Sequence, residues 1–590
     1  MDDKIFDWVM LAEKFSVDGD PLSMRTAAQE IFALDENSAD GFAIMAEASL
    51  YLDKVDEAEY FAGLALESEP KNLRARLVAG GVAIRRIKLR EQLKIFDELV
   101  SDAHDRLKNL QDELRNFNRQ FAFNRRKKNS DDENFQRHLD KKISLARSIL
   151  FKALSWYSNG LYLSGEPDRA ASSLLEASTL TDDEQMEMEL YSKHLFLRNY
   201  RDVQPAQIKQ LAQKYNSFFS RITPFRHDKK FFDAEKIHVG YISPDFREHA
   251  IANFVTPFLR DYDAENFSVT CYSTGKKDFV TEKLKAFDVQ WRSVTGREPH
   301  EIARLIDEDG VDILVDLSGH SQDSCLPVLA YKPAPVQICA LGYTATTGLT
   351  AVDYFLSDKI CSPENFSQAF TEKILRLNTS CLCYSPGLIR EIPDTASTAP
   401  VMKNNFVTFC SFNNFAKVSD EVLFSWRAIL ERVPRSRLVL KGKIFSLDDG
   451  KEIVTERFKR IGFPLDRVEF CPYSPDYLEQ YRDVDIMLDT FPYTGGTTTC
   501  EALYMGVPVV TVRGKTHGAR LSASILSAAD CAELIASNTM DYIQKAVKLS
   551  QRPELITAYH VSLRDHLKKS ALMDGVRYMR GLEKIFRTIN

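Results

Sequence analysis

The sequence predicts an all-α region of repeated helical pairs, followed by two α/β lobes of the Rossmann type. Residues 1–200 show helical spacing of apolar residues with few β-branched runs. From Ile237 onward, short apolar strands alternate with helical stretches, and a second series of the same kind begins after a polar break at residues 390–403. With 590 residues the chain is too long for a single hydrophobic core, so several domains are expected.

The composition is that of an ordinary globular protein and predicts no nucleic-acid partner. Hydrophobic residues make up 44% of the chain, charged residues 27%, and the net charge is -7. No apolar run approaches the roughly 20 residues of a membrane span, and the N-terminus is acidic where a signal peptide is basic. We therefore expect a cytoplasmic protein without a membrane span. All ten cysteines lie at or after Cys271, in spacings that fit neither a zinc site nor a disulfide framework, so reduced thiols are expected.

The helical region carries an internal repeat. The acidic turns at residues 33–37 and 67–71 are one tetratricopeptide period apart, and residues 153–179 repeat the pattern of helix, acidic turn and Ala-rich helix. Between these units, the highly charged, glycine-free residues 85–149 predict a helical hairpin with a polar tip. Its basic cluster Arg125–Lys128 adjoins an acidic run, which favours a solvated tip over a nucleic-acid site. A short solenoid of this kind typically presents a surface to partners.

The α/β series sets the remaining boundaries. Ligands of open α/β sheets bind outside the carboxyl ends of the strands, so the site is expected in the loops that follow them. The expected divisions are a helical domain at 1–200 with the hairpin inserted at 85–149, a connector at 201–236, a first lobe at 237–395, a second lobe at 396–545, and C-terminal helices at 546–590.

Residues 489–506, DTFPYTGGTTTCEALYMG, combine a strand end, a Gly-rich turn and a helix start. Gly495 and Gly496 allow the backbone to approach a ligand, and the free N–H groups of the first helical turn attract an anion. Glu501, one turn into the helix, is placed to accept a hydrogen bond from a ribose. The alternative is a tight turn with threonine caps. Hydroxyl donors for a diphosphate are expected from Thr497, Thr498 and Thr499.

Five motifs occur in order between Ile237 and Ser550. They are HVGYISPDFREHAIANF, VDILVDLSGHS, KPAPVQICALGY, FCSFNNFAKVSDEVLFSWRAILERVPRSRLVLK and DTFPYTGGTTTCEALYMGVPVVTVRGKTHGARLSASIL. Together they resemble the O-linked N-acetylglucosamine transferase family, which joins tetratricopeptide repeats to a two-lobed glycosyltransferase of the GT-B type. The segments SFNNFAK and FPYTGGTTTCEALYMG resemble the bacterial and plant branch, in which a protein O-fucosyltransferase that uses a GDP-sugar also occurs.

The resemblance implies roles for two groups of residues. In the second lobe, on the nucleotide-sugar side, Asn414 and Lys417 follow a strand, and Lys417 matches a lysine that contacts the donor diphosphate. Such a cation would stabilise the charge that develops on the leaving nucleotide. In the first lobe, on the acceptor side, His249 matches a candidate general base, and Asp245 four residues earlier would orient it. A lone histidine is otherwise more often a structural residue.

The resemblance places further residues near the site. Gly342 and Tyr343 begin a turn at residues 342–348 that frames the donor sugar. His320 ends a strand and is expected in the cleft, where it fixes a loop or lies on the sugar side. The segment GKTHGARLSAS starts a helix beside the nucleotide site and carries His517 and Arg520; Arg520 would serve a phosphate or form a salt bridge within the lobe.

The implied function is an inverting protein O-glycosyltransferase that moves a sugar from a nucleotide donor to Ser or Thr of a protein acceptor. UDP-GlcNAc is the first donor choice, although relatives that use it often carry histidine where this chain has Gly496 and proline where it has Thr344. The alternatives are a GDP-fucose-dependent O-fucosyltransferase, a sugar-nucleotide epimerase of the same two-lobed class, and a non-catalytic repeat scaffold with a nucleotide-sugar-binding lobe. No cofactor and no metal are expected, because Lys417 and a helix N-terminus would hold the diphosphate. The sequence predicts no oligomeric state.

Overall fold

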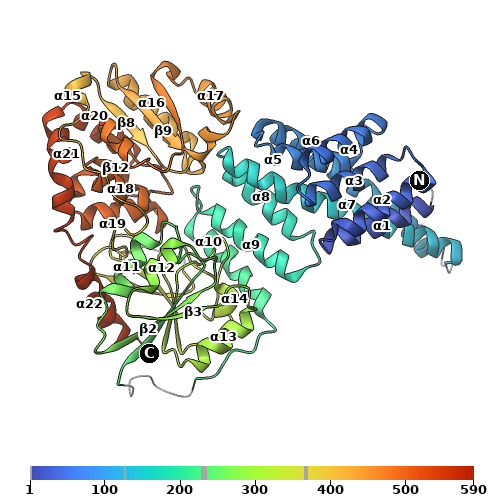
Figure 1. The fold of residues 1–590 in the computed structure, drawn as a ribbon, viewed down its shortest axis with the longest axis horizontal. Helices are drawn as coiled ribbons and strands as arrows, with labels where there is room; N and C mark the ends of the chain where they lie inside the picture. Colours follow the sequence, from blue (N-terminus) through green and yellow to red (C-terminus); the bar gives the residue numbers. More distant parts are fainter. Residues whose placement is uncertain (1–2, 125–127, 228–234, 365–369, 590) are drawn as a thin grey trace. The chain divides into compact units, whose positions relative to one another are not determined.

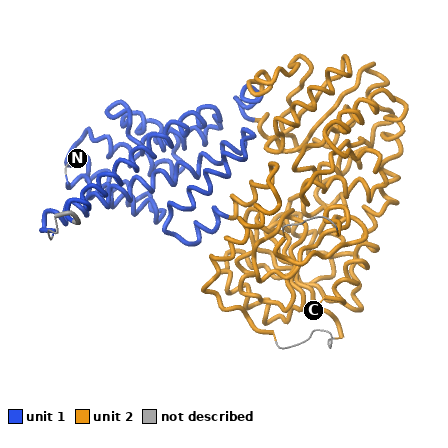
Figure 2. The backbone as a smooth tube through the Cα atoms, turned by 180° about the vertical axis from the view of Figure 1, so that it is seen from behind, with its two compact units in different colours: residues 1–191, 447–454 blue, residues 192–446, 455–590 orange. Residues whose placement is uncertain are grey.

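The structure, a computed structural model, describes residues 3–124, 128–227, 235–364 and 370–589. It divides into two compact units, shown in Figure 2. Unit 1 comprises residues 1–191 and 447–454, and unit 2 comprises residues 192–446 and 455–590. Among the described residues, no helix has both the length and the apolar character needed to cross a membrane.

Unit 1 consists of helices (Figure 1), as the apolar spacing predicts. Ser38 and Asn72 stand one repeat apart, each caps a helix start, and their side chains accept hydrogen bonds from the N–H groups of Gly41 at 3.4 Å and Ala75 at 3.0 Å. The helices are α1(Asp3–Val17), α2(Pro21–Leu34), α3(Ala39–Tyr51), α4(Val55–Ser68), α5(Leu73–Arg85), α6(Leu89–Asn124), α7(Ser130–Leu163) and α8(Pro167–Ser178), and α9(Glu184–Arg198) continues into unit 2.

The long helices α6 and α7 pack against each other over the segment where the hairpin is expected. Asn129 begins α7 with a capping box that pairs it with Asp132. The helix does not break near residue 149 but continues to Leu163, because Ile149, Ala153 and other residues keep a buried face at helical spacing. In the basic cluster of the tip, residues 125–127 lie outside the described part of the chain.

Unit 1 contains a buried cluster of charges at the centre of its helices. Arg74 forms ion pairs with Glu13 and, at 2.7 Å, with Glu47, and the Lys152 ammonium lies 2.9 Å from each of the two carboxylates. Ser16 donates to Glu47 at 2.8 Å. Burial alone would raise the pKa of Glu47, but the attraction of Lys152 and Arg74 outweighs it and lowers that pKa to about 2. Two acids and two bases leave the cluster electrically balanced.

The first lobe of unit 2 is built on a parallel sheet of seven strands in the order β3-β2-β1-β4-β5-β6-β7. Its strands are β1(Ile237–Ser243), β2(Phe267–Ser273), β3(Gln290–Ser293), β4(Ile313–Asp316), β5(Val336–Cys339), β6(Tyr354–Asp358) and β7(Lys373–Leu377), and its helices are α11(Ala252–Arg260), α12(Phe279–Lys285), α13(Pro299–Glu308) and α14(Leu326–Leu329). Near-continuous burial of β1, β2 and β4 is typical of a parallel sheet covered on both faces.

The expected connector is partly helical and packs on this first lobe. Helix α10(Pro205–Tyr215) lies within residues 201–236, and Ile208 together with Val203 contacts Tyr343 and Ala345 of the lobe in one buried apolar cluster. Residues 228–234 of the connector lie outside the described part of the chain.

The second lobe repeats the architecture with six parallel strands in the order β10-β9-β8-β11-β12-β13. The strand order reverses between β8 and β11, and a ligand is expected at such a switch point. The strands are β8(Thr408–Ser411), β9(Arg437–Gly442), β10(Val468–Pro472), β11(Ile486–Leu488), β12(Val509–Val512) and β13(Ile535–Ala536). The helices are α15(Val401–Asn404), α16(Asp420–Arg432), α17(Gly450–Arg460), whose first residues to Val454 are counted with unit 1, α18(Thr497–Tyr504), α19(Leu521–Ala528) and α20(Thr539–Ser550).

The two C-terminal helices pack on different lobes. Helix α21(Pro553–Leu567) contacts α18 of the second lobe, whereas α22(Gly575–Phe586) lies against α11 of the first lobe (Figure 1). Tyr578 and Phe586 of α22 belong to the same buried core as Val239 and Tyr241 of β1. The end of the chain thereby completes the core of the first lobe.

Candidate functional site

A buried carboxylate shapes the Gly-rich turn between β11 and α18. Asp489 is fully buried, and its Oδ1 atom accepts hydrogen bonds from the N–H groups of Thr490 and Gly495, both at 2.9 Å. Its Oδ2 atom accepts from the Thr511 hydroxyl at 2.7 Å. These hydrogen bonds between the protein's own groups hold the turn in a fixed shape, as a pre-organised binding site requires.

The two glycines of this turn differ in what they require. A Cβ atom at Gly495 would lie 2.3 Å from the Thr499 hydroxyl oxygen and 2.9 Å from that of Thr498, so only glycine fits there. A Cβ atom at Gly496 would meet only Leu521, at 3.4 Å. Position 496 thus has room for a side chain, and the structure does not explain why glycine stands there.

The side chains of the three threonines at the start of α18 lie in different surroundings. Thr497 begins the helix and is half-buried, and the Thr498 hydroxyl donates to the Asn413 side-chain oxygen at 2.9 Å. Thr499 is fully buried, and its hydroxyl lies 2.8 Å from that of Ser522, which itself donates to the Gly495 carbonyl. Thr499 therefore supports the turn from behind, in contrast to the expected role of a direct phosphate donor.

Lys417 lies on the other side of the switch point, at the end of the short 3-10 helix Phe415–Lys417 that follows β8. Its ammonium donates to the Thr494 carbonyl at 3.0 Å and lies 4.7 Å from the centre of the Tyr493 ring. Burial lowers the pKa of Lys417 to about 8, against the opposing attraction of Asp489. A cation that bonds a carbonyl just before a helix N-terminus is well placed to receive an anion.

The two asparagines before Lys417 fix its loop by different hydrogen bonds. Asn414 is exposed, and its side chain caps the 3-10 helix by accepting from the Ala416 N–H at 3.1 Å. Asn413 is buried and donates to Asp489 at 3.2 Å. Asn413 thereby links the lysine loop to the Gly-rich turn.

Glu501 is buried one turn into α18 and accepts a hydrogen bond of 2.5 Å from the Tyr477 hydroxyl. Burial raises the pKa of this carboxyl group to about 7, although Tyr477 and the charge of Arg390 counteract the effect. Near neutral pH the group is therefore divided between an acid, which can donate, and a carboxylate, which can only accept.

In the first lobe, His249 and Asp245 come together after β1. The Nδ1 atom of His249 lies 3.5 Å from Asp245 Oδ2, and it is 3.4 Å from the N–H of Ile251. The His249 side chain is 45% exposed, whereas Asp245 is buried and also contacts Arg247 at 3.3 Å. Desolvation lowers the pKa of His249, with Asp245 opposing the shift. An imidazole that is neutral and open to solvent on one side can accept a proton.

His320 is a buried structural residue. Its Nε2 atom lies 2.8 Å from the Thr347 carbonyl and its Nδ1 atom 2.8 Å from the Ser192 hydroxyl. Since a carbonyl only accepts, Nε2 carries the proton and Ser192 donates to Nδ1. Burial lowers the pKa of His320 to about 4, so the ring stays neutral and holds the loop at Thr347.

The turn that begins at Gly342 and Tyr343 is also held in place by close contacts of its own residues. A Cβ atom at Gly342 would lie 2.1 Å from the Leu317 carbonyl oxygen, so the residue must be glycine. Tyr343 is buried, and its hydroxyl accepts from the Asn199 amide at 3.1 Å. Thr344, next in the chain, donates to the Tyr493 hydroxyl at 3.4 Å and so joins this turn to the Gly-rich turn of the second lobe.

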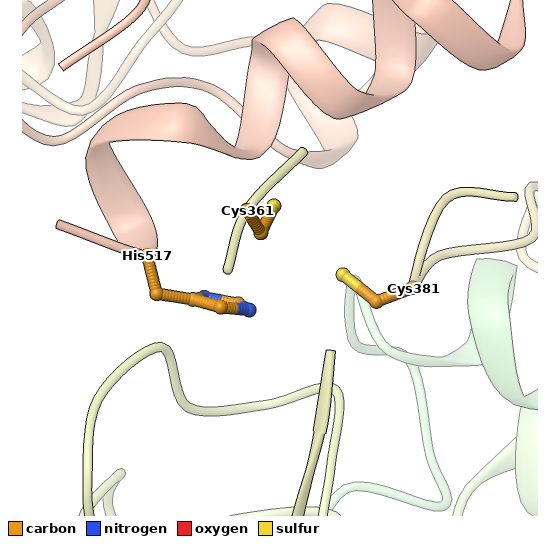
Figure 3. A group of neighbouring side chains, drawn as sticks. All are labelled: Cys361, Cys381 and His517. Atoms are coloured by element: carbon orange, nitrogen blue, oxygen red, sulfur yellow. The ribbon is translucent and has the colours of Figure 1, made fainter. Parts of the chain in front are cut away.

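The segment before α19 places His517 and Arg520 in different surroundings. Arg520 donates to the carbonyls of Ile360 at 2.6 Å and Gly514 at 3.2 Å. The ring of His517 is buried and points toward Cys361 and Cys381 (Figure 3). Burial lowers the pKa of His517 to about 4 despite the opposing charge of Asp358.

Sequence reasoning missed several residues that build the turn: Asn413, Tyr477, Asp489, Tyr493 and Ser522. Asp489 and Tyr493 stand inside the Gly-rich motif, and Asn413 precedes Asn414, so their position was a usable signal. Nothing near Tyr477 or Ser522 in the sequence indicates their partners, which are contributed by other elements.

Two Rossmann-like sheets with a Gly-rich turn at the switch point of the second are typical of a class of protein, the GT-B glycosyltransferases. The chain belongs to glycosyl transferase family 41, whose sequence profile matches residues 208–383 and 390–582. The expected fold class and family are thereby confirmed.

The similar proteins agree with this assignment. SPINDLY of Solanum lycopersicum, named a probable UDP-N-acetylglucosamine–peptide N-acetylglucosaminyltransferase, is 37% identical over 361 residues, which are 60% of this chain and 38% of that protein. SPINDLY of Arabidopsis thaliana, named in the same way, is 37% identical over 364 residues, which are 60% of this chain and 39% of that protein. The matched part therefore spans well under half the length of these curated relatives.

A solved structure, that of a mutant O-GlcNAc transferase from Thermobaculum terrenum, has a similar fold. Its TM-score is 0.69 at 24% identity, with 100% of this chain and 98% of that chain covered. The likeness extends over the helical region as well as the two lobes, and it concerns the fold alone.

Proposed function

We propose that this chain is an inverting protein O-glycosyltransferase that moves N-acetylglucosamine from UDP-GlcNAc to a Ser or Thr hydroxyl of a protein. The observation that carries the proposal is the position of Lys417, beside the pre-organised Gly-rich turn and the free N–H groups at the start of α18. Membership of glycosyl transferase family 41 and the names of the SPINDLY relatives support the reaction and the donor.

In the proposed reaction the second lobe holds the leaving nucleotide. The diphosphate lies against the first turn of α18, where Gly496, Thr497 and Thr498 offer backbone N–H groups or hydroxyls. Lys417 exchanges its bond to the Thr494 carbonyl for one to a phosphate oxygen and neutralises the negative charge that develops as the sugar–phosphate bond breaks. Glu501, ionised, accepts from a ribose hydroxyl. The charge is compensated by the protein itself, so no metal is needed at the diphosphate.

The first lobe serves the acceptor. The acceptor hydroxyl attacks the anomeric carbon on the face opposite to the departing diphosphate, which inverts the configuration. Its proton passes to the His249 imidazole, and the Asp245 carboxylate, 3.5 Å from His249 Nδ1, stabilises the positive charge that the ring then carries. His320, Gly342 and Tyr343 hold the loop that faces the Gly-rich turn through Thr344 and Tyr493. The helices of unit 1 are proposed to bind the protein acceptor.

A GDP-sugar is the second candidate donor, and two departures from the UDP-GlcNAc pattern favour it. Gly496 has no side chain where relatives that use UDP-GlcNAc often carry histidine, and Thr344 donates a hydrogen bond to Tyr493 that a proline could not make. A protein O-fucosyltransferase would use the same lysine and the same turn, but its donor would carry guanine in place of uracil and fucose in place of N-acetylglucosamine.

Donor-dependent thermal shift tests both donors directly, because a ligand that binds only the folded state raises its melting temperature. UDP and UDP-GlcNAc are expected to raise the melting temperature more than GDP and GDP-fucose at equal concentration, equally with and without Mg²⁺. A larger shift with the GDP compounds would instead assign the chain to fucosyl transfer.

Intact-mass analysis then tests the transfer itself. After incubation with each nucleotide sugar and a panel of candidate acceptor proteins, the addition of one N-acetylhexosamine mass to an acceptor, or release of UDP, is expected. If no donor gives either result while it still shifts the melting temperature, the chain is a nucleotide-sugar-binding scaffold and the enzymatic proposal is wrong.

A further inference from the structure

Three side chains that can bind a metal ion lie together inside unit 2, and the proposed transfer reaction uses none of them (Figure 3). One ligand atom each of Cys361, Cys381 and His517 lies within 4.8 Å of the other two. The exposed fractions of the three residues are 0%, 5% and 4%. Cys361 follows β6, Cys381 follows β7 and His517 precedes α19, so the cluster joins segments of both lobes.

His517 is a buried polar side chain without a hydrogen-bond partner. Neither of its ring nitrogens has a partner among the described residues. Its neighbours are the rings of Phe355 and Phe370, whose centres lie 5.2 Å and 6.3 Å from that of the imidazole and which carry no nitrogen or oxygen to bond it. Leaving such a group unsatisfied destabilises the folded state, so a partner that the protein itself does not supply is expected.

A buried carboxylate fixes the two cysteines. Asp358 Oδ1 accepts from the Cys361 N–H at 2.8 Å, and Oδ2 accepts from the Cys381 N–H at 2.8 Å. Oδ2 also accepts from the Ser524 hydroxyl of α19 at 2.7 Å. One carboxylate thus positions both sulfur-bearing residues and ties them to the helix that follows His517. Ligands of bound metal ions are typically oriented by hydrogen-bonded groups of this kind behind them.

We propose that Cys361, Cys381 and His517 bind a zinc ion, with a fourth position left for water. Two thiolates and a neutral imidazole compensate both charges of Zn²⁺, so the buried complex is neutral. Zinc bonds of about 2.3 Å to sulfur and 2.0–2.1 Å to nitrogen place tetrahedral ligand atoms roughly 3.5–3.8 Å apart. The three atoms, already within 4.8 Å of one another, need only small side-chain movements to reach that geometry.

Binding proceeds by exchange of protons for the metal. Each thiol loses its proton to solvent as its sulfur–zinc bond forms, so two protons are released for each ion bound. A cysteine thiol has an ordinary pKa of about 8.5, so near neutral pH each thiol has a proton to release when the metal binds.

The site would stabilise the contact between the lobes beside the Gly-rich turn. Gly518, directly after His517, accepts hydrogen bonds at its carbonyl from the Thr494 N–H at 3.3 Å and from the Thr494 hydroxyl at 2.9 Å. Thr494 is also the residue whose carbonyl receives Lys417. A zinc ion held by His517 would therefore connect two cysteines of the first lobe to the turn of the second.

Titration of the reduced, metal-free full-length chain with Co²⁺, a spectroscopic substitute for Zn²⁺, tests the proposal. We expect one Co²⁺ per chain with intense thiolate-to-cobalt absorption, its loss on addition of one equivalent of Zn²⁺, and release of about two protons per Zn²⁺. Cys361→Ser, Cys381→Ser and His517→Phe should each weaken the absorption at least tenfold.

Matched variants keep the test decisive. Cys531→Ser alters a cysteine of similar burial, 2% exposed, outside the cluster and should bind Co²⁺ like the natural chain. His517→Phe removes no hydrogen bond and keeps an aromatic ring against Phe355, so its metal-free melting temperature should be unchanged. The proposal is wrong if the natural chain shows no thiolate absorption, if His517→Phe leaves it unaltered, or if only Cu⁺ binds.

Discussion

Replacement of Lys417 by Met is expected to reduce transfer strongly without weakening the fold. A single charge about 4 Å from a diphosphate oxygen contributes about 4 kcal/mol at an effective dielectric constant of about 20. If most of that interaction develops in the transition state, Lys417→Met lowers kcat/KM roughly 10³-fold. Among the described residues the Lys417 ammonium has one hydrogen-bond partner, the Thr494 carbonyl, and loss of that bond is a smaller effect.

The same substitution should leave stability unchanged or raise it. The pKa of Lys417 is lowered from its usual 10.5 to about 8, so keeping this side chain charged in the folded state costs free energy at pH 7. After discounting for its partial exposure and the lost hydrogen bond, Lys417→Met should change the free energy of unfolding by between zero and about +2 kcal/mol. The natural chain should gain stability as the pH rises from about 8 to 10.5, where the unfolded state holds the extra proton, and the variant should lack that gain.

The assay combines UDP release from UDP-GlcNAc, with acceptor where one is known, and urea unfolding of the donor-free protein followed through unit 2. Lys443→Met, at an exposed lysine of the same lobe, is the control and should change neither quantity. Retention of more than about a tenth of the activity, or a loss of stability beyond about 2 kcal/mol, would refute the role given to Lys417.

Three further predictions concern the turn, the helical unit and the pH dependence. Gly495→Ala should abolish the donor-dependent thermal shift, because its Cβ would lie 2.3 Å from the Thr499 hydroxyl, whereas Gly496→Ala should retain it; equal effects would contradict the assigned roles. Glu47→Gln should destabilise unit 1 by about 3–5 kcal/mol at pH 7 in urea unfolding, since it leaves buried cations unpaired. Because the folded pKa of Glu47 is about 2, the stability that its ionised form contributes is present above about pH 4.5 and is lost as the pH falls toward 2. If acid unfolding of the natural chain is no steeper than that of Glu47→Gln, the role given to Glu47 is wrong. The donor-dependent shift should increase from pH 6 to pH 8 as Glu501 ionises with a pKa of about 7, and Glu501→Gln should lose this increase; an identical pH profile in both would exclude Glu501 from ribose binding.

Much of the fold could be predicted because its signals are local. The spacing of apolar residues predicts the helices of unit 1, and caps such as Ser38 and Asn72 recur at the repeat period. Short apolar runs separated by helical stretches predict both parallel sheets, and the confirmed GT-B fold follows from their tandem order. The hairpin helix α7 runs past the expected break because its buried face continues to Leu161.

The candidate site could be predicted only in part. The Gly-rich motif and the lysine motif stand out as short segments, but the roles within them depend on partners elsewhere. From its place in the sequence, Thr499 is expected to donate to a phosphate, yet its hydroxyl is paired with that of Ser522 in α19. Asp489 was no candidate, although it organises the turn through Gly495 and Thr511.

By itself, the sequence determined the fold class, the family and the motif at residues 489–506, because helical periodicity, strand alternation and glycine turns are encoded in neighbouring residues. Only the tertiary structure decided which polar groups meet. His517 follows a strand of the second lobe in the sequence, and cysteine spacing gave no sign of a metal site, yet folding brings its ring to Cys361 and Cys381. Such a cluster depends on the packing of two lobes, because its three residues are far apart in the sequence and come from segments of both lobes.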